Sequence, residues 1–343
     1  MRAAAWTDQR DLGIVEKEGR APGEGEVQIA VGSCGICGSD LHWYRGDFPP
    51  VSGLTPGHEI GGTVSAVGAG VDHVREGDIV GVEPSVRCGE CDLCVAGHYQ
   101  HCRDFALLGI ALDGGLAQSV TTPGYTVFAA PSGVDVDLAA LAEPLACSVH
   151  GYEKVGLRQG ETVLVLGAGS IGRTGLLAAR AYGADVLITA RYPHQREAAL
   201  RLGASEVIGD DEAGAKRLAE LATDQAIDVV AEAVGGSADT IGPAVEAVRP
   251  LGRVVVLGVF TIESAGLNPL TLLGKEVTVV GANTYSSPEG RSDYARGLEI
   301  IGEYAEEARS LITHRFPLSQ TGDGFATALD KATQSIKVQI QPN

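Results

Sequence analysis

Four cysteines lie close together in the first half of the chain. They are Cys88, Cys91, Cys94 and Cys102. Three thiolates at C-x-x-C-x-x-C spacing can surround one metal ion from a single loop, and a fourth completes a tetrahedron. Because four thiolates leave no open coordination position, a zinc ion bound there is expected to be structural. An iron–sulfur cluster suits the same ligands, and four free cysteines in a loop are the remaining alternative.

A second set of possible metal ligands is dispersed along the chain. It contains Cys37, the adjacent pair His58 and Glu59, and Glu143. Taken alone, a cysteine or histidine is more often a packing residue than a ligand. Together, one thiolate, one imidazole and one or two carboxylates suit a catalytic zinc that keeps an open position for substrate. The two sets together predict two zinc ions per chain.

A glycine-rich segment follows an apolar run at residues 161–166. It contains Gly167, Gly169 and Gly172, with Ser170 and Ile171 between the last two glycines. A bare G-x-G-x-x-G pattern is weak evidence, but this one lies between a predicted strand and a predicted helix, as the dinucleotide-binding motif requires. The glycines allow backbone N–H groups to approach a pyrophosphate at the helix N-terminus. An ordinary glycine-rich turn is the alternative.

The end of the next strand bears on the choice between the two nicotinamide cofactors. An acidic residue there binds the adenosine ribose 2′-hydroxyl and selects NAD. This chain has Ala190 and Arg191 instead. An arginine can pair with the 2′-phosphate of NADP and stack on the adenine. The sequence therefore predicts NADP. A solvated Arg191, with NAD as the cofactor, is the alternative.

Hydrophobic patterning divides the chain into three segments. Residues 1–152 are rich in Gly and Pro, and alternating runs such as 26–31 and 62–67 predict strands of an irregular β-rich domain. Residues 153–290 alternate apolar strands with helices, which predicts a doubly wound parallel sheet. Residues 291–343 begin helical and end in an alternating strand at 335–340, which we expect to return to the first domain. The predicted strands of the second segment are 161–166, 184–189, 226–231, 252–259 and 276–281, and one predicted helix covers 171–182.

Composition narrows the class of function. The chain has 343 residues, 26 Lys and Arg, and 44 Asp and Glu, which gives a formal net charge of −18. So acidic a surface argues against nucleic acid or an anionic membrane as the partner. The N-terminus has no apolar stretch of the kind that a secretory signal needs, and no apolar run is long enough to span a bilayer. Seven cysteines without a disulfide-like spacing agree with a cytoplasmic protein.

Six motifs, in this order, resemble the zinc-dependent medium-chain alcohol dehydrogenases of the polyol and threonine dehydrogenase branch. The resemblance covers essentially the full length, and it implies an α/β protein with a β-rich GroES-like catalytic domain and a Rossmann cofactor domain. The motifs are C-G-S-D-L-H at 37–42, G-H-E-I-G-G at 57–62, the four-cysteine lobe at 88–102, D-G-G-L-A at 113–117, E-P-L-A at 143–146 and G-A-G-S-I-G at 167–172.

The resemblance implies a role for each dispersed residue. Cys37 and His58 are expected to bind the catalytic zinc, and Glu143 occupies the position of the third protein ligand. Glu59 is either a direct ligand or exchanges with solvent, and the sequence does not rank the two carboxylates. Asp40 is expected to orient His58 from behind. The active cleft is expected between the two domains.

The implied chemistry is hydride transfer. Zinc lowers the pKa of a bound alcohol, and hydride leaves the carbinol carbon for the nicotinamide. Ser39 stands where the family has its hydroxyl relay, so we expect it to take the alcohol proton and pass it through the nicotinamide ribose towards His42.

Substrate identity is the least determined part. Trp43 and Tyr44 follow His42 and are expected to line the cleft, unless one of them packs in the interior. The loop after residue 281 departs from the polyol branch, and Asn283 and Tyr285 are its candidate substrate contacts. The leading hypothesis is an NADP-linked dehydrogenase for a secondary alcohol, polyol or amino alcohol, or for the matching ketone. An NAD-dependent sugar-alcohol dehydrogenase is the alternative, and a nucleotide-binding protein without turnover is the third. A homotetramer or homodimer is expected from the family.

Overall fold

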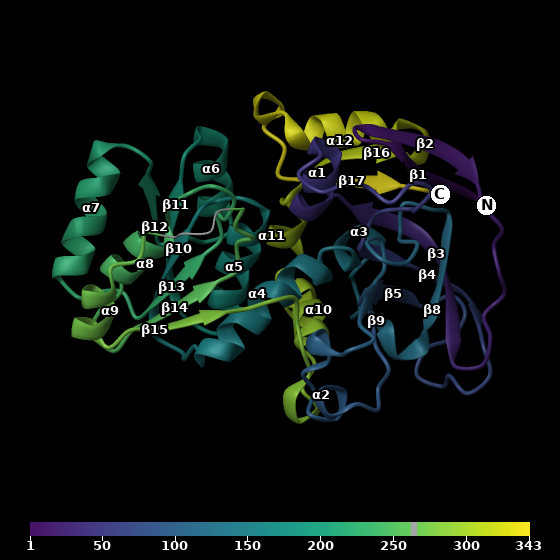
Figure 1. The fold of residues 1–343 in the computed structure, drawn as a ribbon, viewed down its shortest axis with the longest axis horizontal. Coiled ribbons are helices and arrows are strands. Elements are labelled where there is room, and N and C mark those ends of the chain that lie inside the picture. Colours follow the sequence, from purple (N-terminus) through teal and green to yellow (C-terminus); the bar gives the residue numbers. More distant parts are fainter. Residues whose placement is uncertain (262–265) are drawn as a thin grey trace. The chain divides into compact units, whose positions relative to one another are not determined.

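The computed structural model describes residues 1–261 and 266–343, and the chain divides into two compact units. The first contains Met1–Glu143 and Ser286–Asn343, and the second contains Pro144–Tyr285 (Figure 1). The sequence placed these divisions at residues 152 and 290. Helix α4 (Ala142–Val155) runs through the first division, so a boundary taken from composition alone falls at the end of the helix.

The second unit is built on a six-stranded parallel sheet in the order β12-β11-β10-β13-β14-β15. This is the strand order of a doubly wound dinucleotide-binding fold. The predicted α/β class is therefore confirmed. Its strands are β10 (Thr162–Leu166), β11 (Asp185–Ala190), β12 (Glu206–Gly209), β13 (Val229–Glu232), β14 (Arg253–Val256) and β15 (Thr278–Gly281). Its helices are α5 (Ser170–Ala181), α6 (Pro193–Arg201), α7 (Glu212–Thr223), α8 (Ile241–Ala247) and α9 (Pro269–Lys275).

The burial of these strands explains why they appear in the sequence as short apolar runs. Leu164, Leu187 and Val230 point to the face that α7, α8 and α9 cover, and they join one core cluster with Leu221 and Val245 of those helices. The alternate residues of β10 and β11 are also buried, on the opposite face. A strand covered on both faces needs apolar residues at every position. Strand β12 was missed from the sequence because only its two central residues are both apolar and buried.

The first unit is β-rich, as predicted. Its main sheet has seven strands in the order β16-β17-β3-β4-β5-β9, with β8 paired to β3, and β1-β2 and β6-β7 form two smaller sheets. The strands are β1 (Arg2–Asp8), β2 (Asp11–Glu16), β3 (Glu26–Gly35), β4 (Glu59–Val67), β5 (Ile79–Val82), β6 (Ser85–Val86), β7 (Ala106–Leu107), β8 (Ser119–Pro123), β9 (Val127–Ala129), β16 (Ile312–Pro317) and β17 (Lys337–Gln341). The α-helices are α1 (Gly38–Arg45), α2 (Asp92–Val95), α3 (Val136–Ala139), α10 (Asp293–Glu303), α11 (Ala305–Arg309) and α12 (Thr321–Leu329). The 3-10 turns are η1 (Tyr99–His101), η2 (Gly124–Thr126), η3 (Pro288–Gly290), η4 (Leu318–Gln320) and η5 (Lys331–Thr333).

The last strand returns to the first unit, as the sequence predicted. Strand β17 pairs with β3 in antiparallel register, with Ile340 opposite Cys34. Its first residue, Lys337, is 2% exposed and donates to Glu59 Oε1 at 2.5 Å and to the carbonyl oxygen of Ile36 at 3.2 Å. Burial lowers the pKa of Lys337, but Glu59, Cys37 and Glu143 together outweigh burial and raise that pKa. The C-terminal strand therefore supplies the cation for a buried acid on β4.

None of the described helices combines the length and the apolar character that a membrane span requires.

Replacing Lys337 with Met should lower the free energy of unfolding by about 3 kcal/mol, because it leaves Glu59 buried and charged without a partner. Adding Glu59→Gln should recover most of that loss, since the second change removes the unpaired charge. Denaturant unfolding of the wild type, both single variants and the double variant gives the coupling. Lys331→Met, at an exposed lysine on η5, is the matched control. Additive single losses, with no recovery in the double variant, would contradict this interpretation.

Candidate active site

The four-cysteine lobe has the geometry of a tetrahedral metal site. The Sγ atoms of Cys88 and Cys94 are 3.9 Å apart, those of Cys91 and Cys102 3.9 Å, and those of Cys102 and Cys88 3.5 Å. Four sulfurs at zinc–thiolate bond length from a common centre lie about 3.8 Å apart. Among the described residues, no other group of three or more His, Cys, Asp or Glu side chains has all its ligand atoms within 4.8 Å of one another.

Backbone amides favour thiolates in this lobe. A hydrogen bond from the backbone near Cys94 lowers the pKa of Cys91 to about 7. The pKa of Cys102 is also lowered, mainly by a backbone hydrogen bond near Cys88. Desolvation instead raises the pKa of Cys94 to about 12. A metal binds the four cysteines as thiolates. The lowered pKa values of Cys91 and Cys102 favour that form before a metal binds.

The side chain of Arg87 fixes the start of the four-cysteine lobe. The Arg87 guanidinium lies 3.7 Å from the centroid of the Tyr99 ring and 4.6 Å from that of Tyr125. It also donates to Glu83 Oε1 at 2.9 Å. Glu83 is fully buried, and burial raises its pKa to about 7 although Arg87 opposes the shift. The residue preceding Cys88 is therefore held by a buried acid and two aromatic rings.

Helix α1 begins at the first residue of the dispersed set. Cys37 is the N-cap of α1, and its backbone N–H donates to Asp40 Oδ2 at 2.9 Å. A thiol at a helix N-terminus is placed where a negative charge is stabilised. Asp40 is buried, and its other carboxylate oxygen lies 3.7 Å from His58 Nδ1. The same acid thus closes the first turn of α1 and faces the imidazole.

His58 lies at the centre of this cluster. Its Nε2 is 3.3 Å from Ser39 Oγ. Burial alone lowers the pKa of His58, but the charges of Asp40 and Cys37 outweigh burial and hold that pKa well above its usual range, and Glu143 adds to the effect. Cys37, His58 and Glu143 therefore lie close enough to act on one another electrostatically. Their ligand atoms form a looser group than those of the four-cysteine lobe.

Glu59 is oriented differently from its neighbour His58. One carboxylate oxygen accepts from Lys337, and the other has no hydrogen-bond partner among residues 1–261 and 266–343. Gly35 makes room for that carboxylate, since a Cβ there would lie 1.9 Å from Glu59 Oε2. Of the two candidate carboxylates, Glu59 is thus already paired with a cation. Sequence reasoning missed Lys337, because no local pattern links residues so far apart.

The proposed relay residues lie on α1. His42 Nδ1 is 2.6 Å from Asp47 Oδ2, and Arg45 contacts both side chains. The hydrogen bond with His42 lowers the pKa of Asp47. An ionised Asp47 accepts a hydrogen bond from the Nδ1–H of His42, which leaves Nε2 as the ring nitrogen without that proton. Asp47 was missed from the sequence, although a carboxylate five residues after a histidine at a helix end is a readable signal.

The aromatic pair after His42 packs against the interior of the first unit. The Tyr44 ring lies 5.3 Å from Phe325 of α12, and the Trp43 ring lies 6.2 Å from Phe48. Both side chains border the core cluster of this unit. In the loop after β15, Tyr285 is fully buried and Asn283 is exposed.

Each glycine of the dinucleotide loop has its own steric reason. Gly167 has φ +93°, and a Cβ there would lie 2.6 Å from Val234. A Cβ at Gly172 would lie 1.7 Å from the Gly167 carbonyl oxygen, so this glycine lets α5 begin against the loop. Around Gly169 the protein leaves open space, with no atom within 4 Å of an added Cβ. Gly169 is also the N-cap of α5, where Ser170 and the residues after it present free N–H groups. The loop therefore leaves room for a ligand beside Gly169, at the N-terminus of α5.

Two contacts around this loop were not anticipated, one made by Thr189 and one between Arg191 and Asp210. Thr189 Oγ1 accepts from the N–H of Gly167 at 2.8 Å, which ties the loop to the neighbouring strand. Arg191, the predicted reader of a 2′-phosphate, is 71% exposed and lies 3.5 Å from Asp210 Oδ2. Such an exposed ion pair contributes little to stability. Arg191 is available to an anion that displaces Asp210.

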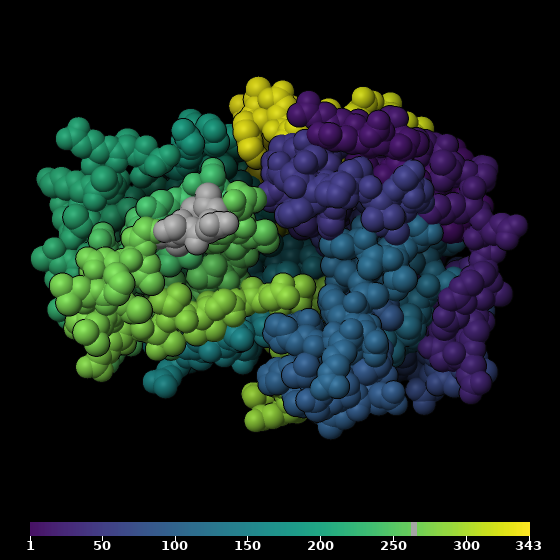
Figure 2. Space-filling model, in the orientation of Figure 1, coloured from purple at the N-terminus to yellow at the C-terminus, as the bar shows by residue number. Residues whose placement is uncertain are grey.

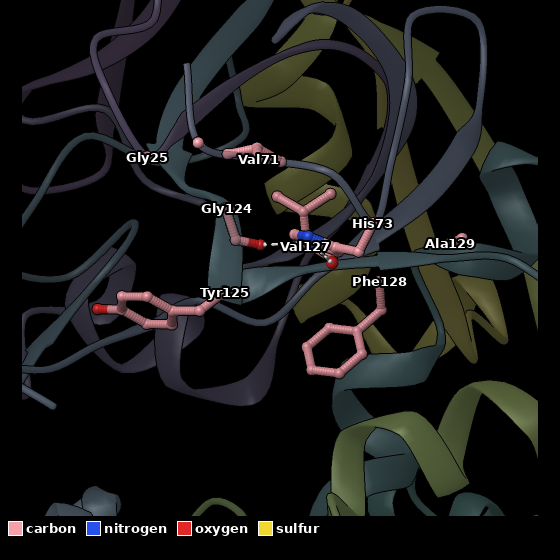
Figure 3. A pocket seen from close by; sticks show the side chains of 9 residues that line it. Gly25, Val71, His73, Gly124, Tyr125, Val127, Phe128 and Ala129 are labelled. Atoms are coloured by element: carbon pink, nitrogen blue, oxygen red, sulfur yellow. Dashed lines mark hydrogen bonds between the residues drawn. The ribbon is translucent and has the colours of Figure 1, made fainter. Parts of the chain in front are cut away.

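A cavity of about 480 Å³ in the first unit contains none of the predicted site residues. Its wall includes Val71, His73 and Phe128 (Figure 3). His73 Nε2 is within hydrogen-bond distance of the carbonyl oxygens of Gly124, at 3.0 Å, and Val127, at 3.2 Å. The imidazole therefore connects the two ends of the Gly124–Val127 turn.

Comparisons with known proteins agree with this geometry. The family model described as alcohol dehydrogenase GroES-like domain matches residues 23–132, and that described as zinc-binding dehydrogenase matches residues 170–303. The chain is 31% identical over 350 residues to sorbitol dehydrogenase of Bacillus subtilis (strain 168), covering 100% of this chain and 98% of the relative.

Two solved structures are similar over 99% of both chains. One, from Sinorhizobium meliloti 1021, is described as a zinc-binding dehydrogenase bound to NADP, with TM-score 0.88 and 29% identity. The other, from Escherichia coli CFT073, is described as a short chain alcohol dehydrogenase complexed with NADH, with TM-score 0.88 and 28% identity. Structural relatives thus bind either nicotinamide cofactor.

The raised pKa of Glu83 predicts how stability depends on pH. Between roughly pH 4.5 and 7 the folded protein holds a proton that the unfolded chain has lost, so the free energy of unfolding falls as pH rises through that window. Glutamine is uncharged at every pH. The fall in the free energy of unfolding should therefore be smaller in Glu83→Gln than in the wild type, by roughly 2–3 kcal/mol. Denaturant unfolding of zinc-loaded protein from pH 5 to 8 measures both slopes.

Glu90→Gln is the matched control, because Glu90 is an exposed carboxylate of the same lobe. Its pH profile should run parallel to that of the wild type. A Glu83→Gln profile that is also parallel to the wild type would refute the role of Glu83.

Proposed function

The chain belongs to the zinc-containing medium-chain alcohol dehydrogenase family, and we propose that it transfers a hydride between NADP(H) and a secondary alcohol, polyol or amino alcohol, or the matching ketone. The observation that carries the proposal is the cluster of the half-buried Cys37 with the buried His58 and Glu143, where the charges of Cys37 and Glu143 act on His58 beside a serine. The similarity to sorbitol dehydrogenase supports a substrate of the polyol class.

A catalytic zinc fits the donor types of this cluster. Cys37, His58 and Glu143 supply a thiolate, an imidazole and a carboxylate, which is a set that leaves a coordination position for substrate. Zinc held there supplies a Lewis acid for the substrate oxygen, and the nicotinamide ring accepts the hydride. Because Asp40 faces His58 Nδ1, the Nε2 atom is the one directed to the metal. We assign Glu59 to a supporting role, since Lys337 already holds its carboxylate.

Proton movement is assigned to α1. Ser39 Oγ lies beside His58 Nε2 and takes the proton that the alcohol loses. His42 receives that proton at the end of the relay, where its Nε2 exchanges with solvent. Asp47 fixes the imidazole by hydrogen bonding to Nδ1, so it keeps the exchanging nitrogen in place.

NADP is the proposed cofactor, with Arg191 pairing with the 2′-phosphate. The strand end has Ala190 where an acid would select NAD, and Arg191 is exposed with only a carboxylate partner 3.5 Å away. An NAD-dependent sugar-alcohol dehydrogenase remains the second candidate, and it is favoured by the Arg191–Asp210 pair if that pair persists with cofactor bound.

We also propose a homodimer or homotetramer that pairs through the outer strand of the cofactor unit. Strand β15 is at the edge of the parallel sheet, and Val279 on it is exposed. Helix α9 precedes β15 in the chain, and its Leu270 and Leu273 are each 73% exposed. Figure 2 shows the light green part of the chain, which contains α9 and β15, at the surface. An open strand edge with apolar neighbours is typical of an interface between copies of one chain.

Replacing Cys37 with Ala should abolish turnover and lower the zinc content from two to one per chain, because it removes the thiolate of the open site. NADPH binding should persist, since the dinucleotide loop is unchanged. Metal analysis and fluorescence titration of NADPH measure the two effects.

Cys34→Ala is the matched control, because Cys34 is a buried cysteine of β3 without a ligand role. That variant should keep both zinc ions and its activity. If Cys37→Ala retains turnover, the catalytic zinc assignment is wrong.

Replacing Arg191 with Ala should weaken NADPH binding by roughly tenfold or more and change NADH binding far less, because a charge-assisted contact with the 2′-phosphate is lost. Asp210→Asn should strengthen NADPH binding, since it frees Arg191 and removes a negative charge near the phosphate. Equal losses for both cofactors in Arg191→Ala would show that Arg191 does not recognise the 2′-phosphate.

A further inference from the structure

One arginine in the cofactor unit is buried without a counter-ion among the residues that the structure describes. Arg173 lies in the first turns of α5, directly after Gly172, and is 1% exposed. It is the largest fully buried side chain of the described residues. Placing a guanidinium inside a protein is costly unless a carboxylate or a set of acceptors compensates the charge. Its position behind the dinucleotide loop therefore requires an explanation.

Arg173 makes one hydrogen bond. Its Nη2 donates to the carbonyl oxygen of Ala168 at 2.5 Å. Its Nε and Nη1 are also buried and have no hydrogen-bond partner within residues 1–261 and 266–343. Burial lowers its pKa to about 10, and the charge of Arg201 adds to that shift, so the side chain stays cationic at neutral pH. The uncompensated charge is thus directed at the second residue of the G-A-G-S-I-G loop.

The hydrogen bond fixes the orientation of one peptide. The peptide between Ala168 and Gly169 is trans, so its N–H points away from its C=O. Because Arg173 holds the Ala168 carbonyl, the Gly169 N–H is directed to the opposite side. Gly169 is itself the N-cap of α5, and a Cβ added to it would meet no atom within 4 Å, so open space lies beside this residue. A carbonyl that accepts from a cation also polarises its peptide, which makes the N–H a better donor.

We propose that Arg173 is a positioning residue for the cofactor pyrophosphate: it locks the Ala168–Gly169 peptide with its N–H towards the phosphates and supplies a buried positive charge behind them. This inference rests on the proposed function, because it concerns the same dinucleotide. It separates two anion-binding contributions. Arg191 acts on the 2′-phosphate, which NADP alone carries, and Arg173 acts on the pyrophosphate, which NADP, NAD and ADP-ribose share.

The test compares three nucleotides on zinc-loaded full-length protein. Calorimetric titrations with NADPH, NADH and ADP-ribose give the affinities of the wild type and of Arg173→Leu. The variant should bind all three roughly tenfold more weakly, because each loses the same pyrophosphate contribution. The melting temperature without nucleotide should stay the same or rise, since leucine removes a buried, unsatisfied charge. A purely structural arginine would give the opposite pattern, a lower melting temperature with unchanged affinity per folded molecule.

Two further variants serve as controls, one that retains the charge and one at another arginine of the same helix. Arg173→Lys retains the charge and should keep most of the affinity for all three nucleotides. Arg180→Leu is the matched control, because Arg180 lies on the same helix and its guanidinium donates to a backbone carbonyl, that of Leu202, away from the loop. It should bind all three nucleotides as the wild type does. If Arg173→Leu does not fold, Arg173→Met, an unbranched apolar replacement, takes its place.

Two outcomes would overturn the inference. One is equal affinity of the wild type and Arg173→Leu for all three nucleotides. The other is a loss confined to NADPH, which would place Arg173 at the 2′-phosphate. A wild-type protein that binds none of the three would instead refute the proposed function, so the two failures are distinguishable.

Discussion

The buried ion pair between Lys337 and Glu59 is the constraint on which the candidate site depends. Lys337 also donates to the carbonyl oxygen of Ile36, so one ammonium contacts the residue before Cys37 and the residue after His58. These two candidate ligands lie on separate segments, one at the end of β3 and one at the start of β4. The last strand of the chain therefore fixes the spacing of two side chains near its beginning. An acid and a base that compensate each other in the interior allow the site to be rigid without a metal.

A second electrostatic constraint applies to the cofactor unit. A chain of net charge −18 has to bind a dinucleotide that is itself an anion. The general field of the protein opposes that binding, so attraction has to be local. The N-terminus of α5 supplies free N–H groups, Arg173 supplies a charge from behind the loop, and Arg191 supplies one at the strand end. Arg173 directly follows G-A-G-S-I-G, and Arg191 lies two residues after Thr189, which bonds to Gly167 of that loop.

Local chemistry explains what could be predicted from the sequence. The parallel strands could be predicted because strands covered on both faces are apolar at every position. The loop could be predicted because close approaches require Gly167 and Gly172, and because Gly169 leaves open space at the helix N-terminus. Lys337, Arg173 and Thr189 could not be found in this way. Lys337 and Thr189 act through contacts with segments far away in the sequence, which no periodicity or motif relates to them. Arg173 contacts Ala168, five residues before it, but a buried arginine looks like a surface residue until the fold encloses it. The sequence left open whether Tyr44 lines the cleft or packs in the interior. In the structure its ring packs on Phe325 of α12, a helix that is distant in the sequence.

The central claim is that this chain is a zinc dehydrogenase which uses NADP to oxidise alcohols. The most direct test is the initial rate of nucleotide reduction with NADP and, separately, NAD, across secondary alcohols, polyols and amino alcohols, on protein shown to contain zinc at both sites. The account predicts reduction with one group of alcohols and a strong preference for NADP. Preference for NAD would contradict the assignment of Arg191 and favour a sugar-alcohol dehydrogenase. No reduction of either nucleotide, together with no oxidation of NADPH by the matching ketones and aldehydes, would contradict the account itself.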